Sequence, residues 1–191
     1  SSYLAKGETR QAWRTSSIFT SWVLLLMIIM LSLGYIFTEP LMGLLTQYDA
    51  SQMALPVSLA RITLIQALFM ALSAIATGIL QSKQHFTWPA IGVLLYNIFI
   101  ILGGVLLVKP IEAMWPGYGV AGFSIGVVVG AIMTLVVQIP TLKKVGFQYS
   151  PCLDTRDPGF RQMLKLILPV VIGLSVSQIN MFVTQYLATG L

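Results

Sequence analysis

Charged residues are scarce in this sequence of 191 residues: they make up 9% of it, whereas 57% of it is hydrophobic. A soluble domain carries about 25% charged residues. So few charges cannot cover the surface of a water-soluble domain, and the composition predicts a membrane protein. The net charge of +5 does not indicate nucleic-acid binding. The basic residues lie between apolar runs and do not gather with aromatics in one polar domain.

Cysteine and histidine are nearly absent. Cys152 is the sole cysteine, which excludes an intrachain disulfide, and we interpret it as a thiol without a special role. His85 is the sole histidine and has no Cys or second His beside it, so we expect no metal site and no cofactor. No glycine-rich phosphate loop or nucleophile motif occurs, and we predict no catalytic residue and no enzyme. The polar start without Met or a signal-peptide pattern predicts a part of a longer protein.

What the sequence does contain is long apolar runs. A helix needs about 20 mainly apolar residues to cross about 30 Å of hydrocarbon. The runs are too long and too continuous for barrel strands, which alternate over about 10 residues. Helices also satisfy their own backbone groups in lipid. We therefore predict an all-α, polytopic transmembrane helix bundle with five spans, at about 17–39, 57–80, 88–108, 118–139 and 168–189.

The basic residues between these runs predict the orientation of the spans, because loop Lys and Arg concentrate on the cytoplasmic side. Arg61 lies within a run and is not counted, and one side then carries only Lys109. The other side carries Lys6, Arg10, Arg14, Lys83, Lys143, Lys144, Arg156, Arg161 and Lys165. This bias places 1–16, 81–87 and 140–167 in the cytoplasm, and 40–56 and 109–117 outside.

The segment DTRDPGFRQMLKLILP predicts a helix that begins at Asp157 and Pro158. Asp accepts hydrogen bonds from free N–H groups at a helix start, and Pro suits the first turn. One face carries Phe160, Met163, Leu164 and Ile167, and the other Arg161 and Lys165. This pattern is typical of an interfacial helix on an anionic inner leaflet, here about 158–167, with a turn into the membrane at Pro169. The alternative is a plain cytoplasmic extension of the last span.

Two residue patterns within the spans raise the question of function. Arg61, about one turn into the second predicted span, either marks a polar substrate cavity or extends its charge to the outer interface. Gly122, Gly126 and Gly130 recur every four residues in the fourth span and predict a face for close helix packing.

Amides within the spans need hydrogen-bond partners across a helix interface or in a wet cavity. Gln178 and Asn180 lie in the fifth span, and Asn97 and Gln138 occur singly. We treat Asn97, Gln178 and Asn180, with Arg61, as candidates for a substrate cavity, although a lone amide more often joins helices. Asp154 and Asp157 form a D-x-x-D that also suits Mg²⁺ with a phosphate, but Pro158 favours a helix cap.

Three stretches carry a resemblance to the MurJ/MviN lipid II flippase family, of the multidrug/oligosaccharidyl-lipid/polysaccharide exporter superfamily. They are GILQSKQHFTWPAIGVLLYN at 78–97, QIPTLKKVGFQYSPCLDTRDPGFRQMLKLILP at 138–169 and GLSVSQIN at 173–180. The family has fourteen spans, and this chain resembles the third to the seventh. The family's charged cavity residues lie mainly on the first, second and eighth spans. Some members bind Na⁺ through an Asp in the seventh span, where this chain has Thr184.

The resemblance implies a part of a transporter in the bacterial inner membrane. Its substrate would be an undecaprenyl-pyrophosphate-linked peptidoglycan precursor, lipid II, moved outward by alternating access. The expected partners are this lipid and anionic membrane lipids, with no nucleic acid, and the coupling ion stays open. One alternative is a drug or polysaccharide exporter of the same superfamily, and another is a membrane scaffold subunit that transports nothing.

Overall fold

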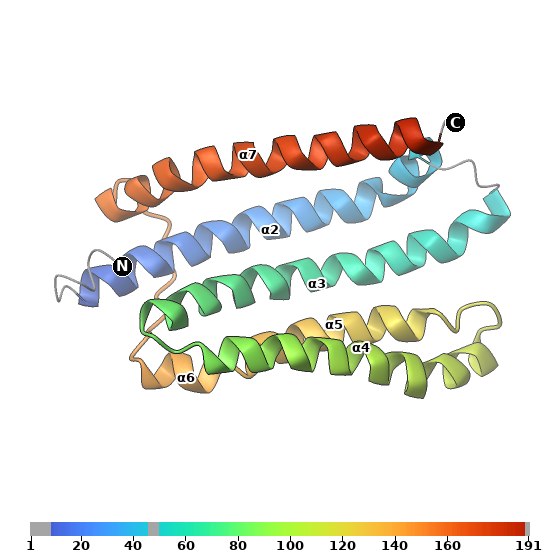
Figure 1. Cartoon of the computed structure of the whole chain (residues 1–191), viewed down its shortest axis with the longest axis horizontal. Helices are drawn as coiled ribbons and strands as arrows, with labels where there is room; N and C mark the ends of the chain where they lie inside the picture. The colour runs from blue at the N-terminus through green and yellow to red at the C-terminus, as the bar shows by residue number, and fades with distance from the viewer. Residues whose placement is uncertain (1–8, 46–49, 190–191) are drawn as a thin grey trace. The chain divides into compact units, whose positions relative to one another are not determined.

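The computed structural model describes residues 9–45 and 50–189, which form helices joined by connecting segments (Figure 1). The helices are α2 (Thr9–Leu45), α3 (Ala50–Ser82), α4 (Thr87–Met114), α5 (Ala121–Val136), α6 (Ile139–Lys144) and α7 (Pro158–Thr189). Within the described residues there is no strand, and the all-α prediction is confirmed. Among residues 9–45 and 50–189, five segments suit a membrane crossing by length and composition: Arg10–Gly43, Met53–Ser82, Thr87–Met114, Ala121–Lys144 and Pro158–Gln178.

The helices extend beyond the predicted spans. The first was expected at 17–39, whereas α2 covers Thr9–Leu45, and α3 begins at Ala50 rather than near residue 57. Pro40, Pro56 and Pro110 lie inside helices rather than at their ends. A proline removes one intrahelical hydrogen bond, while the neighbouring turns keep theirs, so a long apolar helix tolerates it. These three prolines therefore do not mark the ends of the helices.

The expected turn at Pro169 is wrong. Helix α7 runs without interruption from Pro158 to Thr189, with Pro169 inside it. The separate helix at 158–167 is therefore the first part of α7, as in the alternative of an extended last span. The predicted start is confirmed, because the Asp157 carboxylate accepts the Phe160 backbone N–H at 2.8 Å.

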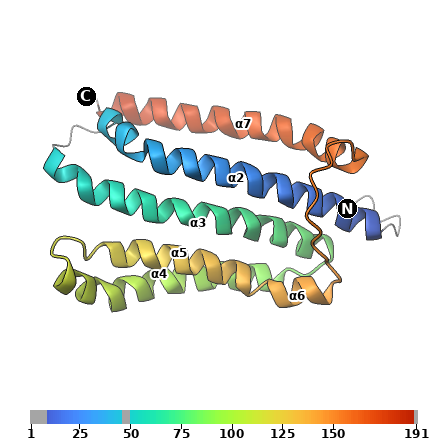
Figure 2. The ribbon, with the colours of Figure 1, turned by 180° about the vertical axis from the view of Figure 1, so that it is seen from behind.

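The chain divides into two compact units. The smaller unit contains Ser1–Phe19 and Ser150–Leu191, and thus the first turns of α2 and all of α7. The larger unit, Thr20–Tyr149, contains the rest of α2 with α3 to α6. Within the larger unit, α3, α4 and α5 lie side by side in both ribbon views (Figures 1 and 2).

Glycine allows α4 and α5 to approach closely. A Cβ on Gly126 would lie 2.6 Å from the Phe99 carbonyl oxygen, and one on Gly103 would lie 2.5 Å from the Gly122 carbonyl oxygen. A Cβ on Gly130 would lie 2.8 Å from the Tyr96 carbonyl oxygen. These neighbours are backbone atoms, which cannot move aside as a flexible side chain can. Only hydrogen in place of a side chain permits this contact.

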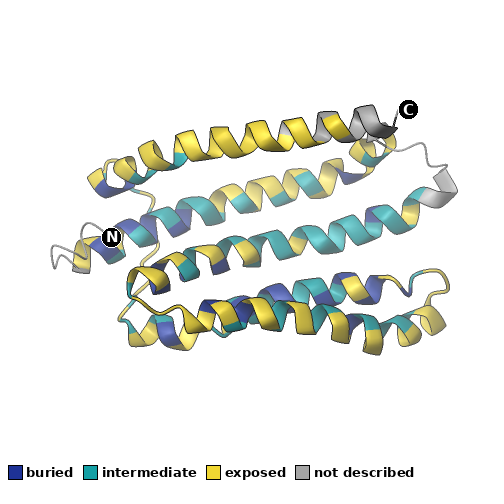
Figure 3. Ribbon diagram, viewed as in Figure 1, coloured by how far each residue is buried: buried dark blue, intermediate teal, exposed yellow. Residues whose placement is uncertain are grey.

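Many positions on the helices are exposed (Figure 3), and many of the exposed side chains are large and apolar. A water-soluble monomer rarely exposes large apolar patches, whereas lipid solvates them. The exposed residues include Ile28, Ile29 and Ile36 of α2, Val93, Leu94, Ile101 and Val105 of α4, and Leu166, Leu168, Val170 and Leu174 of α7.

Candidate functional site

Arg61 belongs to α3 in the larger unit, and its side chain contacts α2. It is about three turns from the start of α3, deeper in the helix than the predicted span placed it. Its guanidinium carbon is 4.8 Å from the centre of the Tyr35 ring, and Nη2 is 3.7 Å from Glu39 Oε2. Tyr35 and Glu39 are four residues apart on α2 and therefore share one helix face. An arginine, an aromatic ring and an acid thus meet at one point.

The Arg61 side chain is half-buried, with 32% of its surface exposed, and its Nε is buried without a hydrogen-bond partner. A charge-assisted N–H···O bond is usually about 2.7–2.9 Å long, so the ion pair with Glu39 is loose. The Glu39 side chain is 70% exposed. Glu39 therefore balances the charge of the guanidinium without a close hydrogen bond, and N–H donors of Arg61 are left without an acceptor among the described residues.

The other cavity candidates lie on other helices, Asn97 on α4 and Gln178 and Asn180 on α7. The Asn97 side chain is exposed, and its Nδ2 donates to the Val93 carbonyl of its own helix at 2.9 Å. Gln178 and Asn180 are exposed on α7, in the smaller unit. Thr184 donates to the Asn180 carbonyl at 2.8 Å, again within its own helix.

A buried amide joins α3 to the end of α5. Gln138 is 0% exposed. Its Nε2 donates to Ser73 Oγ at 2.7 Å and to the Thr134 carbonyl at 2.9 Å, while its Oε1 accepts from Thr77 Oγ1 at 3.0 Å. This arrangement makes Gln138 an interhelical joint. Sequence reasoning missed its partners, although the i, i+4 spacing of Ser73 and Thr77 was a usable signal.

Thr134 extends this joint to α4. Its Oγ1 donates to the Gly92 carbonyl of α4 at 3.0 Å and to the Gly130 carbonyl of α5 at 2.8 Å. Tyr96 of α4 donates to Gln66 Oε1 of α3 at 3.0 Å. Polar contacts thus link α3, α4 and α5 at more than one level, which suits a rigid group of helices.

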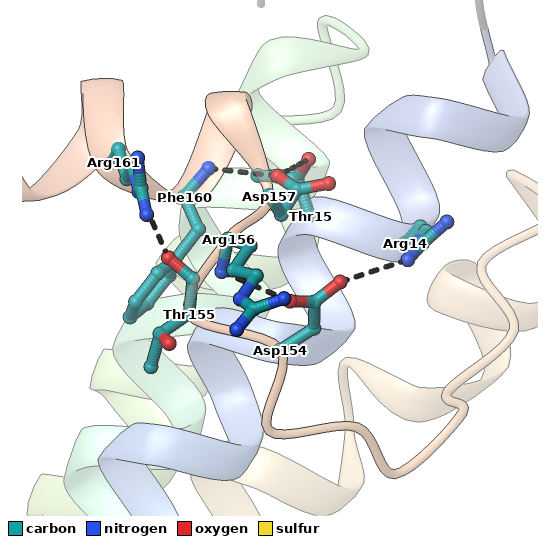
Figure 4. Close-up of polar contacts among 8 residues, drawn as sticks. All are labelled: Arg14, Thr15, Asp154, Thr155, Arg156, Asp157, Phe160 and Arg161. Carbon is teal, nitrogen blue, oxygen red and sulfur yellow. Dashed lines mark hydrogen bonds and ion pairs between the residues drawn. The ribbon is translucent and has the colours of Figure 1, made fainter.

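A second polar cluster lies in the smaller unit, at the start of α7 (Figure 4). Arg14 Nη2 donates to Asp154 Oδ2 at 3.0 Å, and Thr15 Oγ1 donates to Asp157 Oδ1 at 3.0 Å. Asp154 Oδ1 also accepts the Arg156 backbone N–H at 2.9 Å. We call Arg14, Thr15, Asp154 and Asp157 the inner clamp. It fastens the start of α2 to the segment that leads into α7.

The hydrogen bonds of the inner clamp are those expected from the cap interpretation of the D-x-x-D motif. Both carboxylates accept hydrogen bonds from backbone N–H groups and from α2 side chains, as a capping role requires. In the part of the chain that the structure describes, no group of three or more His, Cys, Asp or Glu is placed to hold a metal ion. Asp157 thus caps α7 through the Phe160 N–H, whereas Asp154 accepts from the connecting segment and from Arg14.

A turn at the other end of α4 is also organised by an acid. Glu112 Oε1 accepts the Gly117 backbone N–H, and Oε2 accepts that of Gly119, both at 2.8 Å. Gly117 has a φ of +87°, which other residues rarely adopt. Glu112 therefore shapes the connection between α4 and α5.

Comparison with known proteins shows one family. The family model described as lipid II flippase MurJ matches residues 3–191. The lipid II flippase MurJ of Burkholderia cenocepacia is 25% identical over 147 residues, which are 75% of this chain and 28% of that protein. The probable lipid II flippase MurJ of Rickettsia prowazekii is 24% identical over 135 residues, which are 71% of this chain and 25% of that protein.

A shorter stretch is more similar to another relative. The probable lipid II flippase MurJ of Vibrio cholerae is 36% identical over 63 residues, which are 31% of this chain and 12% of that protein. The chain spans about a quarter of the length of the Burkholderia and Rickettsia relatives.

Proposed function

The chain belongs to the lipid II flippase MurJ family, and on this premise we propose that it forms part of the membrane domain of a lipid II flippase. The substrate would be an undecaprenyl-pyrophosphate-linked peptidoglycan precursor, carried outward across the bacterial inner membrane by alternating access. The observation that carries this proposal is the family match along residues 3–191, which includes every described helix. A flippase is a transporter, and the family agrees with the prediction of no enzyme.

The packing of the larger unit suits a rigid part of such a transporter. Close contact at the glycines and the Gln138 joint make α3, α4 and α5 one packed group. Alternating access needs groups of helices that move as bodies around a site. We propose that α3 to α5 form one of these bodies, and that Arg61, Asn97, Gln178 and Asn180 contribute to the polar route of the lipid headgroup.

We further propose that the start of α7 contacts anionic lipids of the inner leaflet. Arg161 and Lys165 are exposed on this helix, beside exposed Leu164 and Leu166. Basic side chains near an anionic surface contribute about 1 kcal/mol each. This contact requires the predicted orientation, in which residues 140–167 face the cytoplasm.

The test of the flippase function is growth of a strain depleted of its own lipid II flippase. The complete gene that encodes this chain and a gene for residues 1–191 alone would be expressed at matched membrane levels. We expect the complete protein to restore growth and the chain alone to fail, because its relatives are about four times as long. Failure of the complete protein would contradict the proposal. Restored drug resistance or polysaccharide export instead of growth would favour the other exporters of the superfamily.

A further inference from the structure

We propose that Arg61 is an exchangeable oxyanion site at the contact of α2 and α3, in which a phosphate group of the transported lipid takes the place of the Glu39 carboxylate. The inference rests on the proposed function, since it assumes a phosphate-bearing lipid as substrate. It adds a ligand position formed by Arg61, Tyr35 and Glu39.

The guanidinium of Arg61 has no close hydrogen-bond partner on Nη2 or Nε within the part of the chain that the structure describes. Its Nη2 is 3.7 Å from Glu39 Oε2, beyond the range of a charge-assisted hydrogen bond, and its Nε has no partner. A guanidinium offers five N–H donors in one plane, matched to two oxygens of a phosphate or carboxylate. An arginine in an apolar segment gains more from a close oxyanion than from a distant one.

Tyr35 orients Arg61 without using these donors. The ring centre is 4.8 Å from the guanidinium carbon, so the contact is made through the face of the ring. The guanidinium has five N–H donors, and those that are not directed at the ring can still donate to an oxyanion. Tyr35 thus holds the cation in place whether Glu39 or a ligand provides the negative charge.

Glu39 suits the role of a counter-ion that a ligand oxyanion can displace from Arg61. It neutralises Arg61 when no ligand is present, which lowers the free energy of keeping the cation in a segment that crosses the membrane. Its side chain is 70% exposed and forms no close bond to Arg61, so little binding must be broken to displace it. A carrier also needs binding weak enough to release its cargo, and competition from Glu39 supplies that release.

The structural alternative is a permanent ion pair that fastens α2 to α3. The two interpretations predict opposite effects of Glu39→Gln. If the pair is structural, the variant leaves Arg61 without its counter-ion and weakens both folding and function. If Glu39 competes with a ligand oxyanion, the variant binds that oxyanion more tightly.

The experiment measures ligand binding to the complete purified protein in detergent, by the shift of its thermal unfolding temperature with ligand concentration. The ligands are undecaprenyl pyrophosphate, inorganic pyrophosphate and undecaprenol. The first two distinguish a lipid-borne phosphate from a free one, and undecaprenol tests the contribution of the chain without the anion. The variants are Arg61→Gln, Arg61→Lys and Glu39→Gln.

Two residues on the same predicted side serve as matched controls. Lys109→Gln removes the other basic charge of that side, and Glu112→Gln removes an exposed acid that bonds only to the α4–α5 turn in the described structure. Lys109→Gln matches the charge change of Arg61→Gln, and Glu112→Gln matches that of Glu39→Gln, without altering the Arg61 cluster. They separate a specific site from general attraction of anions.

We expect Arg61→Gln to weaken binding of undecaprenyl pyrophosphate about tenfold, and Arg61→Lys to weaken it less, because Lys keeps the charge but loses the planar donors. We expect Glu39→Gln to strengthen binding about threefold. Both controls should stay within about twofold of the unmodified protein. Inorganic pyrophosphate should show the same order of variants at lower affinity.

The inference is overturned if Glu39→Gln weakens binding, or if Arg61→Gln binds no worse than Lys109→Gln. If Arg61→Gln fails to fold, the Arg61→Lys and Glu39→Gln measurements still decide between the interpretations. An unmodified protein that restores growth but shows no dependence on Arg61 would refute this site and leave the flippase function standing. An unmodified protein that restores no growth would refute the flippase function itself.

Discussion

Arg14 Nη2 and Asp154 Oδ2 lie 3.0 Å apart, although 140 residues separate them in the sequence. Three residues after Asp154, the Asp157 carboxylate accepts from Thr15 Oγ1 and from the Phe160 backbone N–H in the first turn of α7. The same short segment thus starts α7 and ties that start to α2. The two aspartates differ in environment, and this difference leads to the first prediction.

Asp157→Ala is expected to destabilise the start of α7 by about 1 kcal/mol, the usual effect of losing a side-chain helix cap. Asp154→Ala is the control and should have a smaller effect. Its partner Arg14 is 62% exposed, and exposed ion pairs contribute about 0–1 kcal/mol. Hydrogen exchange of the backbone amides of residues 159–162 in the complete protein measures the effect of both substitutions. Equal protection in the two variants would contradict the capping role.

Gly126→Ala is expected to destabilise the packing of α4 against α5 by about 1–3 kcal/mol, because the added methyl group would lie 2.6 Å from the Phe99 carbonyl oxygen. Gly78→Ala is the matched control. It also replaces a glycine inside a helix, but no atom lies within 4 Å of its added Cβ.

The control should be neutral or gain about 0.5–1 kcal/mol, as alanine is the better helix former. Thermal unfolding in detergent compares the two variants. A loss of stability at Gly78 as large as that at Gly126 would mean that close packing is not the cause.

Gln138→Leu is expected to cost about 1–3 kcal/mol, since the hydroxyls of the buried Ser73 and the half-buried Thr77 would lose their common partner. Gln81→Leu changes the same residue type on an exposed position of α3 and serves as the control. The measurement is the unfolding temperature of each variant in one detergent. Similar values for Gln138→Leu and the unmodified protein would show that the joint contributes nothing to stability.

The predicted orientation is testable by thiol labelling in a Cys152→Ser background. Met114→Cys, on the predicted outer side, should react with a membrane-impermeant maleimide on intact cells. Gln148→Cys, on the predicted cytoplasmic side, should react only after lysis. Both positions are exposed, so accessibility within the fold does not separate them. Labelling of the Gln148 site alone on intact cells would contradict the predicted orientation and indicate the opposite one.

The sequence by itself determined the helical class and the presence of apolar segments long enough to cross a membrane. Long apolar runs with few charges have one low-energy solution in lipid, a helix that bonds its own backbone. The start of α7 was equally readable, because a cap depends on neighbours within one turn, here Asp157 and Pro158. Local patterns such as these need no knowledge of the rest of the fold.

Only the tertiary structure decided what each polar side chain contacts. That Glu39 and Tyr35 face Arg61, or that Ser73 and Thr77 meet Gln138, depends on helix rotation and register, to which local sequence contributes little. The continuation of α7 through Pro169 was likewise not readable, because one lost hydrogen bond competes with the backbone bonds kept on both sides. The contacts of Arg61 and Gln138 join segments distant in the sequence, and those contacts exist only in the folded chain.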